Sequence, residues 1–492
     1  MTVPGRARRA AVLAVVLVIA AGACASPTTP PATDAIASPS SSVAPPTATP
    51  TAAPTTSPTA RPTPPASPTL APTPPTAIVA GVVDRSSLEV EATYDATLDI
   101  AVASGAIHVG AVIAARNVSG EPIDRLDLNT IAARLGRLDV KSAAVDDRPV
   151  EARVDDQTIT VPLGGILPDG AATIVKLSYT ATLRAGLDGS DWLFTRSGGT
   201  LVLYRWIPWL SRPVPFDRPN HGDPFVTPSS QRVRVRVTTD VPMTLASPGA
   251  APVAVEAASG SAWSFEVADV RDAAVVLAPD FRLTAGAVDG VEVRAYTRGG
   301  LDGARLVAQA KRALDRMADR LGVAYPWPAF TIVETRGGYG MESPGLILVP
   351  RGTAAGNLPY LVHHETAHQW FYGLVGNDQQ AEPFADEAAA DLLARTVLGA
   401  LRGSRCDRAP LDRSIVRYSQ ACYYEVVYIQ GGNVLDDLRE AMGTEPFWST
   451  MGAYVEANRH GLAGTRQLLE ALRAASPVDL LPTLRARFPD LY

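Results

Sequence analysis

The polar and apolar positions of the chain follow two spacings, which change near residue 291. From about residue 77 to residue 291 they alternate in short segments that Gly, Pro, Asn and Asp interrupt. The alternation is clear at 158–161 and 174–177 and strict at 233–237, where Val and Arg take turns. Side chains along a strand point to opposite faces in this way. Because no helical stripe is sustained, we expect an antiparallel β-sandwich or saddle over residues 78–291.

The spacing becomes helical after residue 291. Residues 291–296 read as a strand, and the next segment has apolar side chains at Leu306, Ala310, Leu314, Met317 and Leu321. This spacing places them on one face of a helix. Two more strands are expected at 329–333 and 346–349, on either side of the glycine-rich segment 337–340. A separate α/β domain therefore begins here.

Nearly everything from residue 357 onward is predicted to be helical. One helix is expected over about residues 358–375, and the next begins with Pro383 in its first turn. Gly376 and Gly399 are the expected helix stops. Residues 292–492 should thus form a domain that is mostly helical at its C-terminal end, and the whole chain should be a multidomain α+β protein.

The N-terminus is typical of an exported protein. Three arginines precede an apolar run at 10–21, which is long enough for a signal-peptide core and short for a transmembrane helix. The next residues, Ala21-Gly22-Ala23-Cys24, resemble a bacterial lipobox, although Ala21 replaces the usual Leu. We expect residues 1–23 to be removed and Cys24 to carry a lipid that anchors the protein outside the cytoplasm. Simple secretion is the alternative, because Ala-x-Ala also suits ordinary signal peptidase.

Residues 24–77 are expected to be a disordered linker. Between about residues 26 and 75 they are almost entirely Pro, Thr, Ala and Ser, with too few large apolar side chains to offset the entropy of folding. Polyproline II at ~3.1 Å per residue would let this segment reach on the order of 150 Å. The linker could hold a folded domain away from a membrane.

Charge excludes one class of partner. The formal net charge is -6, and no long run of Lys or Arg follows the first ten residues. A nucleic-acid interface is therefore not expected. Nothing in the sequence indicates an oligomeric state.

The chain has three cysteines, an awkward number in an oxidising compartment. Lipidation of Cys24 would leave Cys406 and Cys422 as one possible disulfide. Two free buried thiols are the alternative, because sequence spacing does not establish disulfide geometry.

The segment that carries chemistry is His364-Glu365-Thr366-Ala367-His368. It reads H-E-x-x-H and lies within the helix predicted over about residues 358–375. Residues i and i+4 lie on one helical face, so His364 and His368 can present their imidazoles to one metal ion. Glu365 would then lie beside a water molecule at that metal. Three of the chain's six histidines occur at 363–368, which favours a metal site over coincidence.

A hydrolytic zinc site needs a third protein ligand and an open position for water. Glu387 on the next predicted helix is the candidate, because a helical hairpin can bring it back to the two histidines. Asp391 lies one turn further on the same face and could accept the free N–H of a ligating imidazole. A solvated helix face is the alternative for both acids. Two imidazoles and one carboxylate suit Zn²⁺ best.

The run His364 to Phe371, with Glu387 after eighteen intervening residues beyond His368, closely resembles the gluzincin metallopeptidases of the alanyl aminopeptidase and leukotriene hydrolase family. Upstream, Gly340-Met341-Glu342-Ser343 resembles the family's G-x-M-E-N strand, whose Glu grips the substrate's α-amine. Downstream, Tyr428-Ile429-Gln430-Gly431 resembles its Y-x-K-G helix, whose Tyr stabilises the oxyanion. The resemblance implies a β saddle, then a thermolysin-like zinc peptidase domain with Glu342, Gly340 and Met341 at the substrate and Glu365 and Tyr428 in catalysis.

Four positions depart from the family pattern. Ser343 replaces Asn, Tyr339 stands where Gly is usual, Gln430 replaces Lys, and Asp386 replaces the Asn before the third ligand. No counterpart is evident for the β-domain residue that helps to hold the amine, and little chain remains for the large C-terminal helical domain. A more open cleft is expected.

Several alternatives stay open. Glu342 could pair with Arg336 or Arg351, and Tyr423 or Tyr424 could take the role of Tyr428. The expected function is zinc-dependent hydrolysis of peptides or proteins, of the aminopeptidase type. An endopeptidase, an enzyme acting on non-peptide amides or epoxides, and a non-catalytic tethered binding protein are the competing readings.

Overall fold

The computed structural model describes residues 77–216, 224–399 and 403–492, all of which belong to one unit of the chain, 71–492. The expected signal peptide, the lipidated Cys24 and nearly all of the expected linker lie outside these residues.

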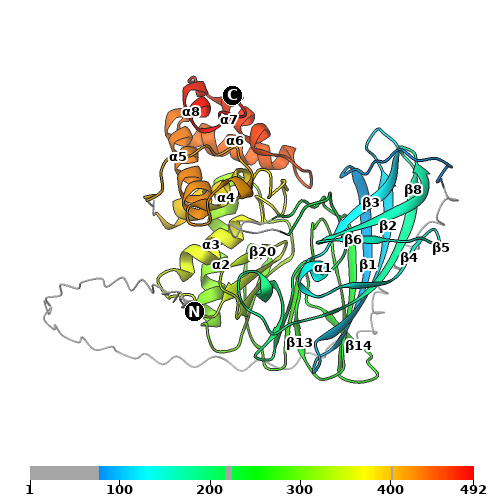
Figure 1. Ribbon diagram of the computed structural model, residues 1–492. Helices are drawn as coiled ribbons and strands as arrows, with labels where there is room; N and C mark the ends of the chain where they lie inside the picture. Colours follow the sequence, from blue (N-terminus) through cyan, green and yellow to red (C-terminus); the bar gives the residue numbers. More distant parts are fainter. Residues whose placement is uncertain (1–76, 217–223, 400–402) are drawn as a thin grey trace, which may run out of the picture. The chain divides into compact units, whose positions relative to one another are not determined.

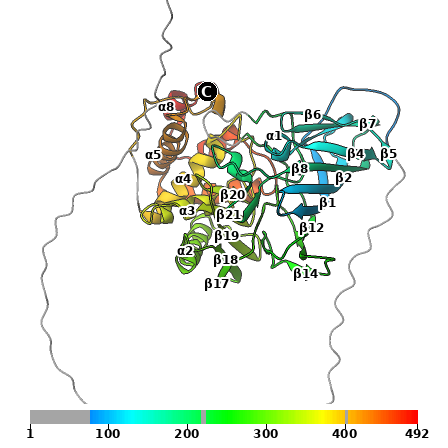
Figure 2. The same cartoon turned by 60° about the horizontal axis from the view of Figure 1, so that its bottom comes forward.

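The largest sheet of the N-terminal half has eight strands. In spatial order they are β14 (Val253–Val255), β15 (Ser261–Val267), β12 (Val233–Thr239), β1 (Val90–Ala101), β2 (Ala106–Asn117), β8 (Ala172–Thr182), β4 (Asp139–Val145) and β5 (Arg148–Pro149). Figures 1 and 2 show β1, β2, β4 and β8 side by side. Every pairing is antiparallel except β1 with β12. The alternation predicted for β12 is confirmed, because its valines at 233, 235 and 237 are buried.

Two four-stranded sheets complete this half. One has the order β13 (Thr244–Ala246), β16 (Val275–Ala278), β10 (Thr200–Leu203), β9 (Phe194–Ser197), and the other β11 (Trp209–Leu210), β3 (Ile123–Asn129), β7 (Thr158–Leu167), β6 (Arg153–Asp155). Tyr94 of β1 stacks on Trp209 of β11 with ring centroids 4.2 Å apart, and its hydroxyl accepts the Leu210 N–H at 2.9 Å. The sheets therefore pack through an aromatic core, as a sandwich requires.

The C-terminal half is built on a mixed five-stranded sheet. Its order is β17 (Arg282–Val288), β18 (Val291–Thr297), β19 (Ala329–Thr335), β21 (Leu346–Pro350), β20 (Met341–Ser343). Because β17 pairs antiparallel with β18 along its whole length, this sheet begins before the boundary expected at residue 291. The predicted amphipathic helix is α2 (Gly303–Leu321), and its apolar stripe is buried.

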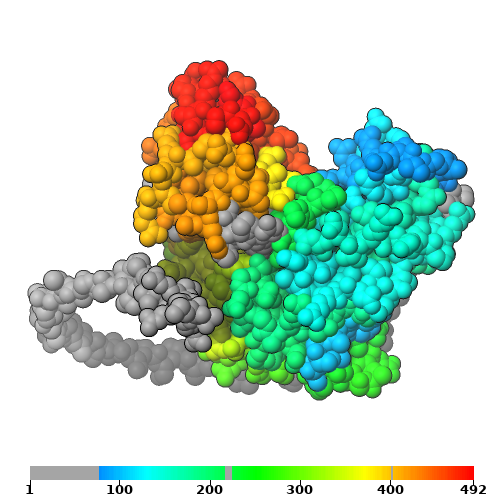
Figure 3. Space-filling view, in the orientation of Figure 1, coloured from blue at the N-terminus to red at the C-terminus, as the bar shows by residue number. Residues whose placement is uncertain are grey.

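Helices follow the sheet: α3 (Leu358–Ala367), α4 (Phe384–Leu398), α5 (Gly431–Met442), α6 (Thr444–Ala457), α7 (Thr465–Ala475) and α8 (Leu481–Arg487). Figure 1 shows α4 to α8 gathered together, and on the face in Figure 3 the orange and red helices form a surface separate from the cyan strands. The predicted start at Pro383 and stop at Gly399, which has a left-handed φ of 71°, are confirmed.

Two predictions for the helical part are wrong. The helix predicted over about residues 358–375 ends at Ala367. It does not reach residue 375 because Tyr372 has φ 116°, far from the helical region. Gly376 is accordingly no helix stop and instead bridges Leu462. The described residues 403–422 are irregular apart from the short turn Ile415–Arg417.

Candidate active site

Helix α3 places the two histidines as their spacing predicts. His364 lies within α3, and His368 follows its last residue while keeping helical dihedrals, φ -63° and ψ -8°. Both side chains are buried. One turn of helix therefore separates two imidazoles that face the same point.

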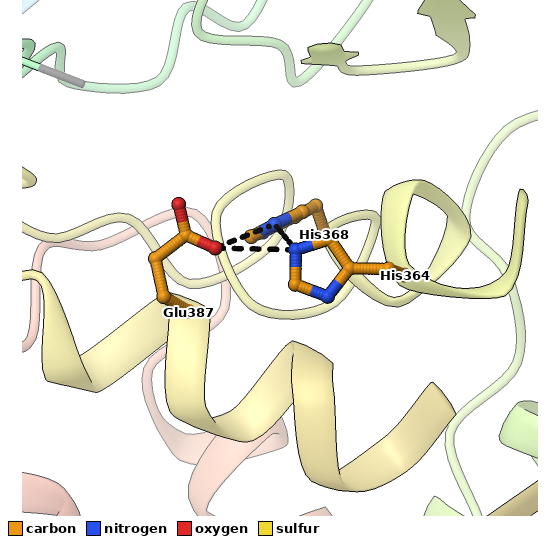
Figure 4. Close-up of side chains that lie close together, drawn as sticks. All are labelled: His364, His368 and Glu387. Carbon is orange, nitrogen blue, oxygen red and sulfur yellow. Dashed lines mark hydrogen bonds and ion pairs between the residues drawn. The ribbon is translucent and has the colours of Figure 1, made fainter. Parts of the chain in front are cut away.

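Glu387 reaches this point from the first turn of α4. Its Oε2 lies 3.2 Å from His364 Nε2 and 3.3 Å from His368 Nε2, and the two Nε2 atoms are 3.2 Å apart. Figure 4 shows the three side chains pointing toward one another. The predicted convergence of two imidazoles and one carboxylate is thus present in the structure.

The three donor atoms fit a metal ion. His368 Nδ1 lies 3.0 Å from the Phe371 carbonyl oxygen, an acceptor only, so Nδ1 carries the proton and the Nε2 lone pair faces Glu387 and His364. Two buried imidazoles and a carboxylate within 4.8 Å of one another form the nitrogen and oxygen donor set that zinc prefers.

Charge in the pocket also favours a cation. Burial raises the pKa of Glu387, but the His368 and His364 imidazoles outweigh burial and hold that pKa well below its ordinary value. Burial opposes a charged His368, yet the Glu342 and Glu387 carboxylates raise its pKa well above the usual range. Burial lowers the pKa of His364. Buried carboxylates without compensating charge are costly, so a dication is the natural counter-ion.

Asp391 does not have the predicted contact. Among the described residues His364 Nδ1 has no hydrogen-bond partner, and the His368 ring is held by a main-chain carbonyl instead. Asp391 accepts a hydrogen bond from the Tyr360 hydroxyl at 2.5 Å and pairs with Arg395 at 2.7 Å. Its place on α4 turns the carboxylate toward the next turn of its own helix rather than toward the imidazoles.

Glu365 is buried, at 4% exposure, and lines the same cavity as the histidines. The neighbouring Gly340 makes room for it, because a Cβ at that position would lie 2.2 Å from Glu365 Oε1. The glycine of the G-x-M-E segment therefore leaves the space that the glutamate of the H-E-x-x-H segment occupies.

Glu342 lies on β20 at the edge of the sheet, 3% exposed, and lines the cavity together with Met341 and Gly340. One of its oxygen atoms comes within 4.8 Å of ligating atoms of Glu365 and His368. Gln379 Nε2 donates to Glu342 Oε1 at 3.0 Å. No pattern in the sequence indicated this amide partner.

Tyr428 lies in a π-helical turn, Glu425–Gln430, just before α5. Its ring stacks on His364 with centroids 5.4 Å apart, and its hydroxyl donates to Glu387 Oε1 at 2.5 Å. Tyr424, an alternative for the same role, reaches the Tyr360 hydroxyl at 3.4 Å instead. Of these tyrosines, Tyr428 is the one that the structure brings onto a candidate ligand.

The cavity at this site has a volume of about 530 Å³. Its lining includes all three candidate ligands, Glu342, Glu365 and a group of tyrosines at 339, 360, 423, 424 and 428. A second cavity of about 560 Å³ shares Tyr339, Tyr360 and Tyr424 with it and continues past α3. The two cavities together leave room for more than one residue of a peptide.

The positions that depart from the family pattern are explained by contacts. Asp386 accepts hydrogen bonds from Asn377 and Gln379, both at 3.0 Å. Ser343 donates its hydroxyl proton to Asp272 of the β-rich half. The ring of Tyr339 packs edge-on against Trp192 at 5.1 Å. Each departure thus has a local partner.

Gln430 and the two cysteines secure the loop before the π-helical turn. The Gln430 amide donates to the carbonyls of Cys406 and Asp407, both at 3.0 Å, and Cys406 and Cys422 form a disulfide. The loop that precedes Tyr428 is therefore tied down at several points.

A buried network joins the two halves beside the site. Arg205 donates to the Tyr372 hydroxyl at 2.7 Å, and Tyr372 donates to Asp272. Arg271 donates to the carbonyls of Gly373 and Leu374, both at 3.2 Å. These contacts hold the turn that follows His368.

Two imidazoles from H-E-x-x-H, a glutamate from the next helix and a second glutamate in the same cavity define the metal centre of a gluzincin metallopeptidase. Residues 306–484 match the model of the peptidase family M1 domain. This part of the chain is therefore similar to the metallopeptidases of that family.

Two plant proteins illustrate the sequence relationship. The chain is 23% identical over 387 residues to aminopeptidase M1-B of Oryza sativa subsp. japonica and 22% identical over 373 residues to aminopeptidase M1 of Arabidopsis thaliana. These matches cover 69% and 66% of this chain but 43% and 41% of the relatives. The chain therefore spans less than half the length of these relatives.

Solved structures show the same fold. The M1 zinc metallopeptidase from Deinococcus radiodurans matches with a TM-score of 0.62 and 19% identity, covering 79% of this chain and 91% of that one. A mutant of that enzyme bound to a Tyr-Ser-Ala substrate matches with a TM-score of 0.63 and 19% identity, covering 81% and 93%. The two-domain M1 fold, a β-rich sandwich followed by a catalytic domain with a helical end, is confirmed.

Proposed function

We propose that this protein is a zinc-dependent aminopeptidase that removes residues from the free N-terminus of peptides outside the cytoplasm. The observation that carries the proposal is the convergence of His364, His368 and Glu387 within 3.3 Å of one another, with Glu365 and Glu342 in the same cavity. The plant relatives are named aminopeptidases, which agrees with the proposal.

His364, His368 and Glu387 would hold the zinc ion. When bound, zinc lowers the pKa of a water molecule toward ~7 and polarises the scissile carbonyl. Glu365 takes the proton of the attacking water and passes it to the departing amine. The Tyr428 hydroxyl donates a hydrogen bond to the oxyanion that develops on the carbonyl.

Glu342 supplies the aminopeptidase preference. Its carboxylate is buried close to Glu365 and His368, where a free α-ammonium group of a substrate would meet negative charge in a site of low dielectric. An acetylated N-terminus is uncharged and gains no such attraction. The carboxylate therefore favours substrates with a free amine.

The test compares matched peptides with free and acetylated N-termini, using the purified protein with and without a chelator. We expect stepwise release of N-terminal residues from the free peptide, loss of activity with the chelator and recovery with zinc. Equal cleavage of the acetylated peptide at internal bonds would identify an endopeptidase, which the continuous second cavity could serve. A zinc-loaded protein with no turnover on a peptide pool would identify a binding protein.

We also propose that the protein is exported and tethered to the membrane by a lipid on Cys24. The support is the order of arginines, apolar run and lipobox-like segment in the first 24 residues. Within the described residues, no helix combines the length and apolarity needed to cross a membrane. Fatty-acid labelling of the wild-type protein and of Cys24→Ala tests this proposal. We expect label on the wild-type protein alone, and label on both proteins or on neither would exclude a lipid on Cys24.

A further inference from the structure

Gln379 lies between α3 and α4 and connects the candidate amine-binding carboxylate to the rest of the protein. It is 2% exposed, and it is not a member of the cavity lining. Its Nε2 donates to Glu342 Oε1 and to Asp386 Oδ2, both at 3.0 Å. Its Oε1 accepts a hydrogen bond from Arg205 NH2 at 3.4 Å. One amide therefore has two carboxylates on one side and a guanidinium on the other.

This charge arrangement determines which way the amide points. The opposite orientation would turn Oε1 toward the Glu342 carboxylate and the NH₂ group toward the Arg205 guanidinium, so both of these contacts would become repulsive. Arg205 is itself held by the Tyr372 hydroxyl at 2.7 Å and by Asp272 at 4.0 Å. The donor that faces Glu342 is thus set by residues of the β-rich half.

We propose that Gln379 is a positioning residue for the amine-binding site and determines how strongly the enzyme prefers a free N-terminus. This inference rests on the proposed aminopeptidase function. A hydrogen bond to one carboxylate oxygen holds Glu342 in a single orientation before the substrate arrives, so the carboxylate need not be ordered during binding. The β-rich half then contributes to amine recognition through Arg205, which holds Gln379.

The direct test is Gln379→Met, which keeps the length of the side chain and removes its donors. Two competitive inhibitors are compared, an L-amino acid and the carboxylic acid with the same side chain but no amine. We expect the Ki of the amino acid to rise about tenfold, because a hydrogen bond to a charged group is lost, and the Ki of the des-amino acid to stay within about twofold. The KM for a free peptide should rise by the same factor, with little change in kcat.

Asn377→Leu is the matched control. Asn377 donates to Asp386 Oδ1 and to the Glu382 carbonyl, both at 3.0 Å, so this variant disturbs Asp386 from the other side. If Gln379 acted by positioning Asp386 and, through it, the adjacent ligand Glu387, both variants would bind less zinc or have a lower kcat. Zinc content and thermal unfolding are measured for each. Should Gln379→Met not fold, the shorter amide of Gln379→Asn provides the same comparison with a smaller expected rise.

A double-mutant cycle completes the test. In a Glu342→Ala background, Gln379→Met should weaken the amino acid no further, because the two residues act as a unit. Equal weakening of both inhibitors, or an undiminished effect of Gln379→Met without Glu342, would overturn the inference. A wild-type enzyme that is zinc-loaded but cleaves no free peptide would instead overturn the proposed function itself, so the two failures are distinguishable.

Discussion

The contact between Gly340 and Glu365 makes a sharp prediction for Gly340→Ala. The added Cβ would lie 2.2 Å from Glu365 Oε1, 2.8 Å from its Cδ and 2.8 Å from Leu361 Cδ1, whereas ordinary contact begins at 3.4 Å. Glu365 must therefore withdraw by about 1.2 Å, the difference between 3.4 Å and 2.2 Å. A base displaced by ~1 Å can lose about 100-fold in rate, and general-base catalysis as a whole contributes roughly 10²- to 10⁴-fold.

We expect kcat/KM of Gly340→Ala on a free peptide to fall about 100-fold, because the base moves while the candidate metal ligands keep their places. None of the three atoms nearest to the new Cβ belongs to His364, His368 or Glu387, so zinc content should stay at the wild-type level. Gly338→Ala, two residues earlier, is the control, because a Cβ there meets nothing within 4 Å. Full activity in Gly340→Ala, or loss of its zinc, would refute the reasoning that room for Glu365 is what the glycine provides.

Four further predictions follow from the site and its scaffold. Glu365→Gln should keep zinc while kcat falls by roughly 10²- to 10⁴-fold, measured by metal analysis and steady-state kinetics. Tyr428→Phe should lower kcat by about 10²-fold with a nearly unchanged KM, as expected for an oxyanion donor; an unchanged kcat would transfer that role to another group. Removing zinc should lower the melting temperature in a zinc-dependent way, because zinc binds the folded state, and a melting temperature indifferent to zinc would argue against the ligand set. For Asp124, burial raises the pKa, but the backbone N–H groups of 83–85 and Arg125 lower it overall. Its stabilisation is therefore present above the ordinary pKa near 3.8 and lost as the pH falls through the lowered value, so Asp124→Asn should cost ~1 kcal/mol at pH 7 and less at pH 2, measured by denaturant unfolding.

The local elements could be predicted because their causes are local. Helix α2 follows from its apolar spacing, and α4 begins at Pro383 and ends at Gly399 because those residues favour a first turn and a left-handed cap. The alternation of β12 likewise identified its buried face. Each of these patterns is contained within one short segment.

The errors occurred where distant segments interact. Helix α3 stops at Ala367, and Tyr372 in the turn that follows donates its hydroxyl to Asp272, which lies 100 residues away in the chain. Asp391 faces Arg395 and Tyr360 rather than an imidazole. Asp272 and Tyr360 could not be identified from the residues that surround Tyr372 and Asp391 in the sequence, whereas Arg395 lies one helical turn from Asp391.

The sequence by itself determined the pair of imidazoles, because i and i+4 on one helix face the same way whatever the rest of the protein does. It also determined the candidates for the third ligand and the base. Only the tertiary structure decided that Glu387 meets those imidazoles, that Gly340 makes room for Glu365 and that Gln379 holds Glu342. Such contacts depend on how helices and sheets pack, and packing is set by the whole buried core rather than by the spacing of a few residues.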